Sequence, residues 1–374
     1  MGVTLKQIAD LAGVHKSTVD KVIHNRPGVS DARRQQIKKL LEEYGYESNP
    51  LAKALNYQKK KMTVAVVMPT VDAMPTLRKG MELVQQDFNS FNIEVVYYKI
   101  PFEATEQVPC LEKLPKEDIA GAVVLPIEVP EVARAMQKLK EQKIPVVAIN
   151  SDLQTEPYMC YVGQDMVQAG QVAARMMGLL LPHGGKLAII SSNNMRAVKQ
   201  REYSFRESVS ALCPRVDVCA SMDIVEKPEH AYQQTIAFLQ QHPDVQALVI
   251  TCGCVPDICR AVRETGRDLT ILCYERYDEI AQLVKKGEIA CTISGDLREQ
   301  GRLAMRLLFE KLIYEREKRS VQKNYLREVW IFSRPAKACR RIKRRHTFFA
   351  DFFCKKVLTI HLRFAILAFI IIHK

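Results

Sequence analysis

Between residues 62 and 330, the sequence repeats one pattern of short apolar runs separated by segments of helical length. The runs are TVAVVMP (63–69), IEVVYYKI (93–100), GAVVLP (121–126), IPVVAIN (144–150), KLAIISS (186–192), VQALVIT (245–251) and LTILCY (269–274). Continuous apolar runs are typical of strands buried on both faces, as in parallel sheets covered by helices. The alternation therefore predicts a doubly wound parallel α/β architecture. The polar stretch NSDLQTEP interrupts it and favours two lobes with a break near 150–165, and LREVWIF (326–332) reads as a closing strand.

The first 61 residues have a different character, that of short helices. Thr4 and Gln7 have the spacing of a capping box, and Gly13 is a stop signal for the helix that they begin. A second helix is expected over about 16–24, and a third from Ser30 to the residue before Gly45. The apolar positions Val19, Val22, Ile23, Ile37, Leu40, Leu41 and Tyr44 are expected to point inward. Asn49-Pro50 predicts a fourth, very short helix that ends in a lysine linker.

The formal net charge of +13 is concentrated at the two ends of the chain. Residues 1–61 carry 12 Lys and Arg against 6 Asp and Glu, and residues 331–374 carry 11 basic residues against one acidic residue. The central 62–330 has 32 basic and 35 acidic residues. Contacts with phosphate are therefore expected at the terminal segments.

The 11 cysteines are scattered without the spacing of a disulfide framework, and the N-terminus lacks the pattern of a secretion signal. We therefore expect a cytoplasmic chain with reduced thiols, in which Cys252, Cys254 and Cys259 are buried in an α/β core. Glycine-rich phosphate loops, zinc-ligand spacings and nucleophile elbows are absent from the sequence. These observations argue against an enzyme, a cofactor and a metal site.

Residues 333–374 differ from everything before them. The basic stretch RPAKACRRIKRRH (334–346) is followed by the apolar VLTIHLRFAILAFIII (357–372), which contains His361 and Arg363. Its 16 residues fall short of the roughly 20 that a spanning helix needs, so a membrane partner is not expected. We interpret 333–374 as an atypical tail. The alternative is a membrane-surface anchor.

The N-terminal residues contain T-L-x-x-I-A-x-x-A-G-V, S-T-V-x-x-V, V-S-x-x-x-R, G-Y and N-x-x-A-x-x-L. In this combination they resemble the DNA-binding head of the lactose-repressor (LacI) family. The central region more loosely resembles that family's effector domain, which is similar to periplasmic binding proteins. The resemblance implies a helix-turn-helix head (1–48), a hinge helix and linker (49–61) and a two-lobed effector-binding and dimerisation domain (62–332).

As function, the resemblance implies a transcriptional regulator, more specifically a repressor. It implies a homodimer or dimer of dimers on a pseudo-palindromic operator, controlled by a small, carbohydrate-like effector. If the apolar tail acts as an anchor, the alternative is a membrane-associated sugar-sensing regulator. Base contacts are implied for Lys16, Ser17 and Lys21 in the recognition helix. Contacts on the phosphate side are implied for Thr4, Asn25 and Ser30. Two positions depart from the family pattern: His15 stands where a Ser or Thr cap is usual, and Asp20 replaces a common Ser.

The segment 49–57 resembles the family's hinge helix through Asn49, Ala52 and Leu55. A helix this short is unstable alone and is expected to fold only when paired with its dimer mate on DNA. Leu55 corresponds to the family's wedge leucine, which enters the minor groove and opens a base step.

In folds of this class, the ligand lies in the crevice beyond the carboxyl ends of the strands. Polar residues that follow predicted strands are therefore candidate effector contacts. The resemblance adds an arginine that binds ligand hydroxyl groups and an acidic residue that accepts hydrogen bonds from them. The candidates are Asn150, Asp152, Gln164, Asp165, Arg201 and Glu275. Residues 62–87 contain no aromatic residue to stack on a sugar, and Gly295-Asp296-Leu297 replaces a common Gln-Asp-Pro. These departures weaken the case for a plain hexose.

Overall fold

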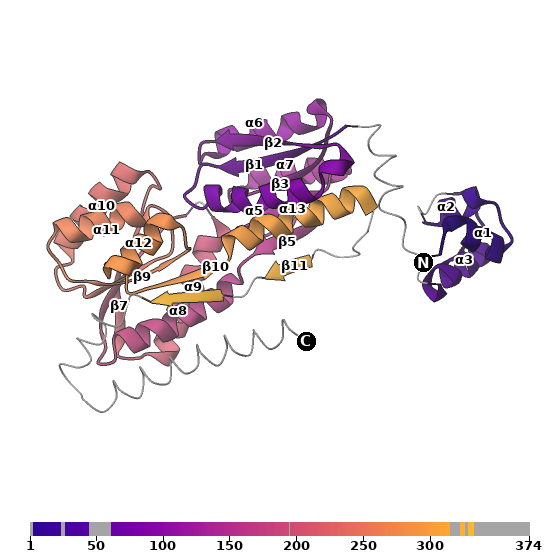
Figure 1. Ribbon diagram of the computed structural model, residues 1–374. Helices are drawn as coiled ribbons and strands as arrows, with labels where there is room; N and C mark the ends of the chain where they lie inside the picture. Colours follow the sequence, from indigo (N-terminus) through magenta and orange to yellow (C-terminus); the bar gives the residue numbers. More distant parts are fainter. Residues whose placement is uncertain are drawn as a thin grey trace.

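The computed structural model describes residues 3–23, 27–44, 61–193 and 195–314, together with the backbone of 322–325 and 328–332. They form a small helical head and two α/β lobes (Figure 1). The predicted hinge helix and the C-terminal tail lie outside the described residues. Within the described residues, no helix combines the length and the apolar character that crossing a bilayer requires.

The head contains three helices around a small apolar core. They are α1 (Leu5–Ala12), α2 (Lys16–Ile23) and α3 (Asp31–Glu43). The predicted capping box is confirmed, because the Gln7 amide donates to Thr4 Oγ1 at 3.3 Å and Thr4 N donates to Gln7 Oε1 at 2.8 Å. Gly13 ends α1 in the left-handed conformation, with φ 61°. The buried side chains of this core are Ile8, Ala9, Ala12, Val19, Val22 and Ile37.

Two local expectations for the head need correction. Tyr44 was expected inside, but it is 42% exposed. It is the residue that ends α3, so its side chain leaves the inward-facing stripe of the helix. Ser30 does precede α3 with extended backbone, as expected for an N-cap, but its side chain makes no capping hydrogen bond.

Lobe 1 is a six-stranded parallel sheet with the order β11-β5-β4-β3-β1-β2. Helices α6 and α7 cover one face, and α5 and α13 cover the other (Figure 1). Its elements are β1 (Met62–Pro69), α5 (Met74–Asp87), η1 (Asn89–Phe91), β2 (Ile93–Ile100), α6 (Ala104–Lys113), η2 (Leu114–Glu117), β3 (Ile119–Val124), α7 (Pro130–Glu141), β4 (Val146–Ile149), β5 (Cys160–Gly163), α13 (Leu297–Tyr314) and β11 (Gln322–Tyr325).

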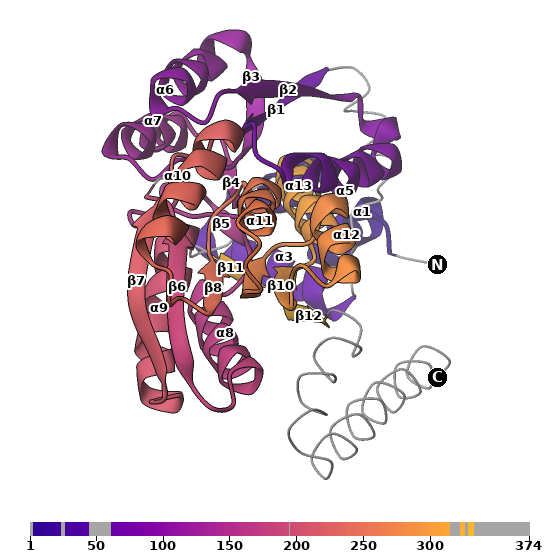
Figure 2. The same ribbon diagram turned by 90° about the vertical axis from the view of Figure 1, so that its left-hand side faces the viewer.

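Lobe 2 has a second six-stranded sheet with the order β12-β10-β9-β8-β6-β7, in which only β12 runs antiparallel to its neighbour. Helices α8 and α9 pack side by side against this sheet, seen in Figure 2 beside β6 and β7. Its elements are α8 (Met166–Leu180), β6 (Gly185–Ser191), α9 (Arg196–Leu212), β7 (Val216–Asp223), α10 (Pro228–Gln241), β8 (Ala247–Ile250), α11 (Val255–Glu264), β9 (Thr270–Tyr274), α12 (Asp278–Lys286), β10 (Cys291–Gly295) and β12 (Glu328–Phe332).

The doubly wound prediction is confirmed, since each of the seven apolar runs contains a strand and 326–332 contains β12. Strands β5, β7, β10 and β11 were not among the predicted runs. β7 lies at the edge of its sheet and alternates between exposed and less exposed residues, so it has no continuous apolar run. The predicted burial of Cys252, Cys254 and Cys259 is also confirmed, and all nine described cysteines are free thiols.

The chain passes between the lobes at two described crossovers, which touch each other. The first runs from β5 through Gln164 and Asp165 to α8, and the second runs from β10 through Asp296 to α13. A Cβ built on Gly295 would lie 3.6 Å from the Cβ of Gln164. These two described crossovers are therefore packed together.

Helices α5 and α13 approach so closely in lobe 1 that glycine is required at their contact. A Cβ built on Gly80 would lie 1.9 Å from the carbonyl oxygen of Arg298, and one built on Gly301 would lie 1.9 Å from that of Leu77. Both obstacles are backbone atoms, which cannot rotate away as a side chain could.

We predict that Gly80→Ala and Gly301→Ala each destabilise the protein by about 1–3 kcal/mol, because the helices must separate to admit the methyl group. The sign of the change in the free energy of unfolding tests the contact, because Gly→Ala in an unhindered helix stabilises the protein by up to about 1 kcal/mol. Chemical denaturation measures the free energy of unfolding, and Lys79→Ala, at an exposed position of α5, is the matched control. Glycine variants as stable as the parent chain would contradict the close contact.

Candidate DNA-binding helix and effector cleft

The outer face of α2 presents the three residues that were predicted to contact bases. Lys16, Ser17 and Lys21 are exposed, whereas Val19 and Val22 on the other side are buried in the head core. Ser17 and Lys21 are four residues apart and therefore lie one above the other on the helix surface. This is the arrangement that a recognition helix needs to enter a major groove.

The start of α2 is held by His15. Its Nδ1 accepts a hydrogen bond from the Ser17 amide at 3.2 Å and lies 2.8 Å from Ser17 Oγ. The imidazole thus satisfies one of the amide groups that a helix N-terminus leaves without an intrahelical partner. At this position, where the resemblance places a Ser or Thr cap, histidine supplies the cap instead.

The residues predicted on the phosphate side have different surroundings. Thr4 is exposed, and its hydroxyl is already part of the capping box of α1. Ser30 is exposed at the start of α3, with no capping bond from its hydroxyl. Asn25, Asn49, Ala52 and Leu55 lie outside the described residues, and their roles stay predictions.

The two lobes contact each other through polar side chains at the carboxyl ends of their strands. These contacts join Arg196 Nε to Asp152 Oδ1 at 3.1 Å, Tyr277 OH to Asp72 Oδ2 at 2.9 Å, Lys227 Nζ to Glu103 Oε1 at 3.5 Å, and the Ala197 amide to Ser151 Oγ at 3.3 Å. The cleft is therefore closed by bonds that the chain itself provides.

Arg201 is the central charged group of the cleft. It lies on α9, is only 5% exposed, and donates from one guanidinium nitrogen to Gln164 Oε1 at 3.0 Å and to the Glu275 carboxylate. The guanidinium also stacks on the ring of Tyr274, 4.7 Å from its centroid. Three predicted residues are thereby brought together: Arg201 and Glu275 from lobe 2 and Gln164 from the first crossover.

Asn150 belongs to the same region of the cleft. Its Nδ2 donates to Oε1 of Gln300, on α13, at 3.4 Å. Asn150 and Glu275 both have left-handed backbone, with φ 64° and 69°. Such conformations are uncommon for residues other than glycine and are enriched at ligand sites. Glu275 is fixed there by its amide, which donates to Ile293 O at 2.9 Å.

The other two predicted effector residues are engaged differently. Asp152 pairs with Arg196 across the cleft and accepts from Tyr158 OH at 3.4 Å. Asp165 caps α8, because its Oδ1 accepts from the amides of Val167 and Gln168 at 3.1 and 3.0 Å. The structure thus gives Asp165 a capping role at the first crossover.

Four buried polar atoms in the cleft have no hydrogen-bond partner within the described residues. They are the donors Gln164 Nε2 and Arg201 Nε and the acceptors Glu275 Oε2 and Glu128 Oε2. Buried polar atoms are almost always paired, and leaving one unpaired costs about 1–3 kcal/mol. These four atoms can pair with a polar group supplied from outside the chain.

Two carboxyl groups that sequence reasoning missed also face this region. Burial raises the pKa of Glu128, partly opposed by the nearby Arg196. Burial likewise raises the pKa of Glu226, opposed by hydrogen bonds from the Ser192 hydroxyl and the Gly253 amide. Each follows a strand of its sheet, β3 for Glu128 and β7 for Glu226, which is the signal that could have identified them.

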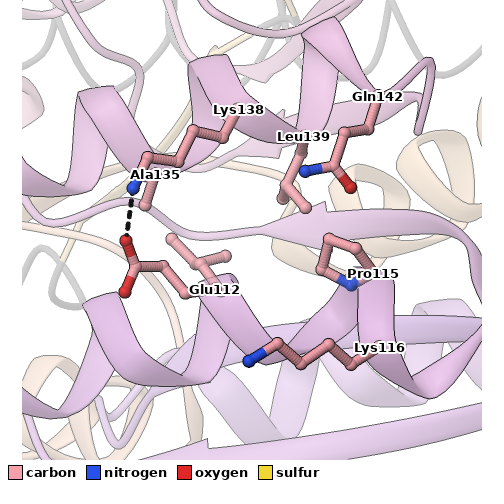
Figure 3. A pocket seen from close by; sticks show the side chains of 8 residues that line it. Glu112, Pro115, Lys116, Ala135, Lys138, Leu139 and Gln142 are labelled. Atoms are coloured by element: carbon pink, nitrogen blue, oxygen red, sulfur yellow. Dashed lines mark hydrogen bonds and ion pairs between the residues drawn. The ribbon is translucent and has the colours of Figure 1, made fainter.

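A separate pocket opens between α6 with η2 and α7, on the outer side of lobe 1 (Figure 3). It has a volume of about 240 Å³ and is bordered by the ion pair between Lys138 Nζ and Glu112 Oε1, which are 2.7 Å apart. Its lining residues are Leu111, Glu112, Pro115, Lys116, Ala135, Lys138, Leu139 and Gln142. It contains none of the predicted effector residues and does not lie at the carboxyl ends of strands, so we do not assign the effector to it.

Comparisons with known proteins agree with this two-part organisation. Residues 4–49 match the family described as bacterial regulatory proteins, lacI family, and residues 64–316 match the periplasmic binding protein domain. The chain is 25% identical over 210 residues to the HTH-type transcriptional regulator DegA of Bacillus subtilis, a match that covers 56% of this chain and 61% of DegA. That match spans less than two thirds of DegA.

A second relative is similar over more of its length. The HTH-type transcriptional regulator MalR of Streptococcus pneumoniae is 21% identical over 322 residues, which covers 83% of this chain and 93% of MalR. Among solved structures, GanP, a glucose-galactose binding protein from Geobacillus stearothermophilus, superposes with a TM-score of 0.66 at 21% identity. That superposition covers 74% of this chain and 99% of GanP and shows the shared fold.

The helix-turn-helix head, the two parallel α/β lobes and both family matches lead to one assignment: the chain belongs to the lacI family of bacterial regulatory proteins and has an effector domain of the periplasmic-binding-protein type.

Proposed function

We propose that this chain is a sequence-specific repressor of transcription whose affinity for its operator is controlled by a small, carbohydrate-like effector. The observation that carries the DNA-binding part is the outer face of α2, where Lys16, Ser17 and Lys21 are exposed above a buried apolar side. A helix of this kind can insert into a major groove and offer donors to base edges.

The arrangement on DNA follows from the symmetry of operators. One head reads only a few base pairs, and a homodimer places two heads on the two halves of a pseudo-palindrome. We therefore propose a homodimer, or a dimer of dimers, as the active form. The hinge segment 49–57 would fold between the two heads on DNA, with Leu55 entering the minor groove.

The unpartnered atoms of the cleft support a polyhydroxy effector. Gln164 Nε2 and Arg201 Nε require acceptors, whereas Glu275 Oε2 and Glu128 Oε2 require donors. Vicinal hydroxyl groups supply both, because each hydroxyl donates one hydrogen bond and accepts others. The solved relative GanP is described as a glucose-galactose binding protein, which agrees with a carbohydrate but does not identify it.

A selection experiment tests the DNA-binding function. The full chain is incubated with a library of randomised duplexes, and the bound sequences are determined. We expect enrichment of a two-fold-symmetric site, with binding that weakens steeply as salt increases, because Lys and Arg release counterions from the phosphates. A bound pool as random as the starting library would overturn the proposed function.

We predict that Lys21→Ala weakens binding to the selected site by about 1–3 kcal/mol and relaxes the base preference at one position of each half-site. Fluorescence anisotropy with the selected duplex and with single-base variants measures both effects. Lys38→Ala, at an exposed position on α3, removes the same charge from the head outside the recognition helix. The assignment of Lys21 fails if the two variants lose affinity equally and keep the same base preferences.

We predict that Gln164→Glu lowers effector affinity at least about tenfold, the equivalent of one lost hydrogen bond to the ligand. The variant keeps an oxygen to accept from Arg201 but replaces the unpartnered Nε2 donor with an acceptor. A thermal-shift screen of the full chain against pentoses, hexoses and disaccharides identifies a ligand, since binding to the folded state raises stability.

Titration of that ligand then compares Gln164→Glu with Gln168→Glu, which alters an exposed residue of α8. Arg201→Ala is a less suitable probe, because it leaves the Glu275 carboxylate buried without its cation and destabilises the fold itself. Unchanged affinity in Gln164→Glu would show that this amide does not contact the ligand.

A further inference from the structure

The contact between His15 and Ser17 constrains what Ser17 can offer to DNA. The Ser17 amide donates to His15 Nδ1 at 3.2 Å, and Ser17 Oγ lies 2.8 Å from the same nitrogen. A ring nitrogen that accepts a hydrogen bond from an amide carries no proton of its own. Accepting from the amide corresponds to the tautomer with the His15 proton on Nε2, and in that tautomer the hydrogen bond to Ser17 Oγ is donated by the serine hydroxyl.

This direction of donation uses the only proton of the Ser17 hydroxyl. A serine hydroxyl has one donor and two acceptor lone pairs, and it normally rotates to suit whatever faces it. Once its proton is directed to His15, only the lone pairs remain available. Both side chains are exposed at the start of α2, so these lone pairs are presented on the face that would meet the major groove.

We propose that His15 is a positioning residue that makes Ser17 an obligate hydrogen-bond acceptor, so that Ser17 selects bases with an amino group in the major groove. Adenine N6 and cytosine N4 are the amino donors there, whereas guanine and thymine present the acceptors O6, N7 and O4. The inference rests on the proposed DNA-binding function and adds a base preference to it. A threonine at position 15 would cap the helix but leave the Ser17 hydroxyl free to donate or accept.

The test separates capping from positioning with two substitutions at one residue. In His15→Asn, Oδ1 occupies nearly the place of Nδ1 and accepts from both Ser17 groups. In His15→Thr, the hydroxyl oxygen is one bond closer to the backbone, so it caps the helix without directing the Ser17 proton. Asn and Thr are both favourable N-cap residues, so both variants are expected to fold. Thermal denaturation of each full-length variant checks this.

Randomised-duplex selection is carried out with the parent chain, His15→Asn, His15→Thr and Ser17→Ala. Ser17→Ala identifies the base position that Ser17 reads, as the position whose preference is lost. At that position we expect the parent chain and His15→Asn to favour adenine or cytosine by about fivefold. We expect His15→Thr to show less than about twofold preference while its salt dependence of binding stays unchanged.

Two outcomes would overturn the inference: a preference in His15→Thr as strong as in the parent chain, or selection of guanine or thymine by the parent chain at the Ser17 position. Loss of the amino preference in His15→Asn would also count against it, because that variant retains the acceptor. Failure of the proposed function looks different, since no sequence would then be enriched by any of the four proteins.

Discussion

The buried guanidinium of Arg201 is the interaction on which the arrangement of the cleft depends. A charge that is only 5% exposed has to be met by an opposite charge and by hydrogen bonds, or the folded state loses several kcal/mol. Its partners come from two places: Glu275 follows a strand of lobe 2, and Gln164 lies on the crossover from lobe 1. The relative position of the lobes and the pairing of this charge are therefore determined together.

The crossovers explain how a change at this charge can reach both lobes. Tyr161 OH donates toward the carbonyls of Asn150 and Gln164 at 3.2 and 3.3 Å, which fixes the end of β5 beside the end of β4. Gly295 packs next to Gln164, and a Cβ built on it would lie 3.0 Å from Gln300 Nε2 and 3.6 Å from the Cβ of Gln164. A ligand that moved Gln164 would thus act on both of these crossovers. This provides a mechanical route from the cleft to the orientation of the lobes.

Most of the fold could be predicted from the sequence, because strands buried on both faces leave continuous apolar runs that no surface element produces. β7 was not predicted, because this edge strand alternates between exposed and less exposed residues and has no continuous apolar run. Within the site, Arg201 and Glu275 were found through the family resemblance, and Asn150 and Gln164 because they follow strands. Arg196 and Gln300 were missed. Their partners, Asp152 and Asn150, belong to other parts of the chain, and no local pattern records how two lobes close on each other.

The closed cleft also limits how an effector can act. A ligand shifts a conformational equilibrium only by the difference between its affinities for the two states. Bonds such as Tyr277 to Asp72 and Arg196 to Asp152 join the two lobes through side chains of the chain itself. In the function proposed above, the differential affinity comes from the buried atoms of Gln164, Arg201, Glu275 and Glu128 that have no hydrogen-bond partner within the described residues. An effector that pairs all four would stabilise this state over any arrangement in which they separate.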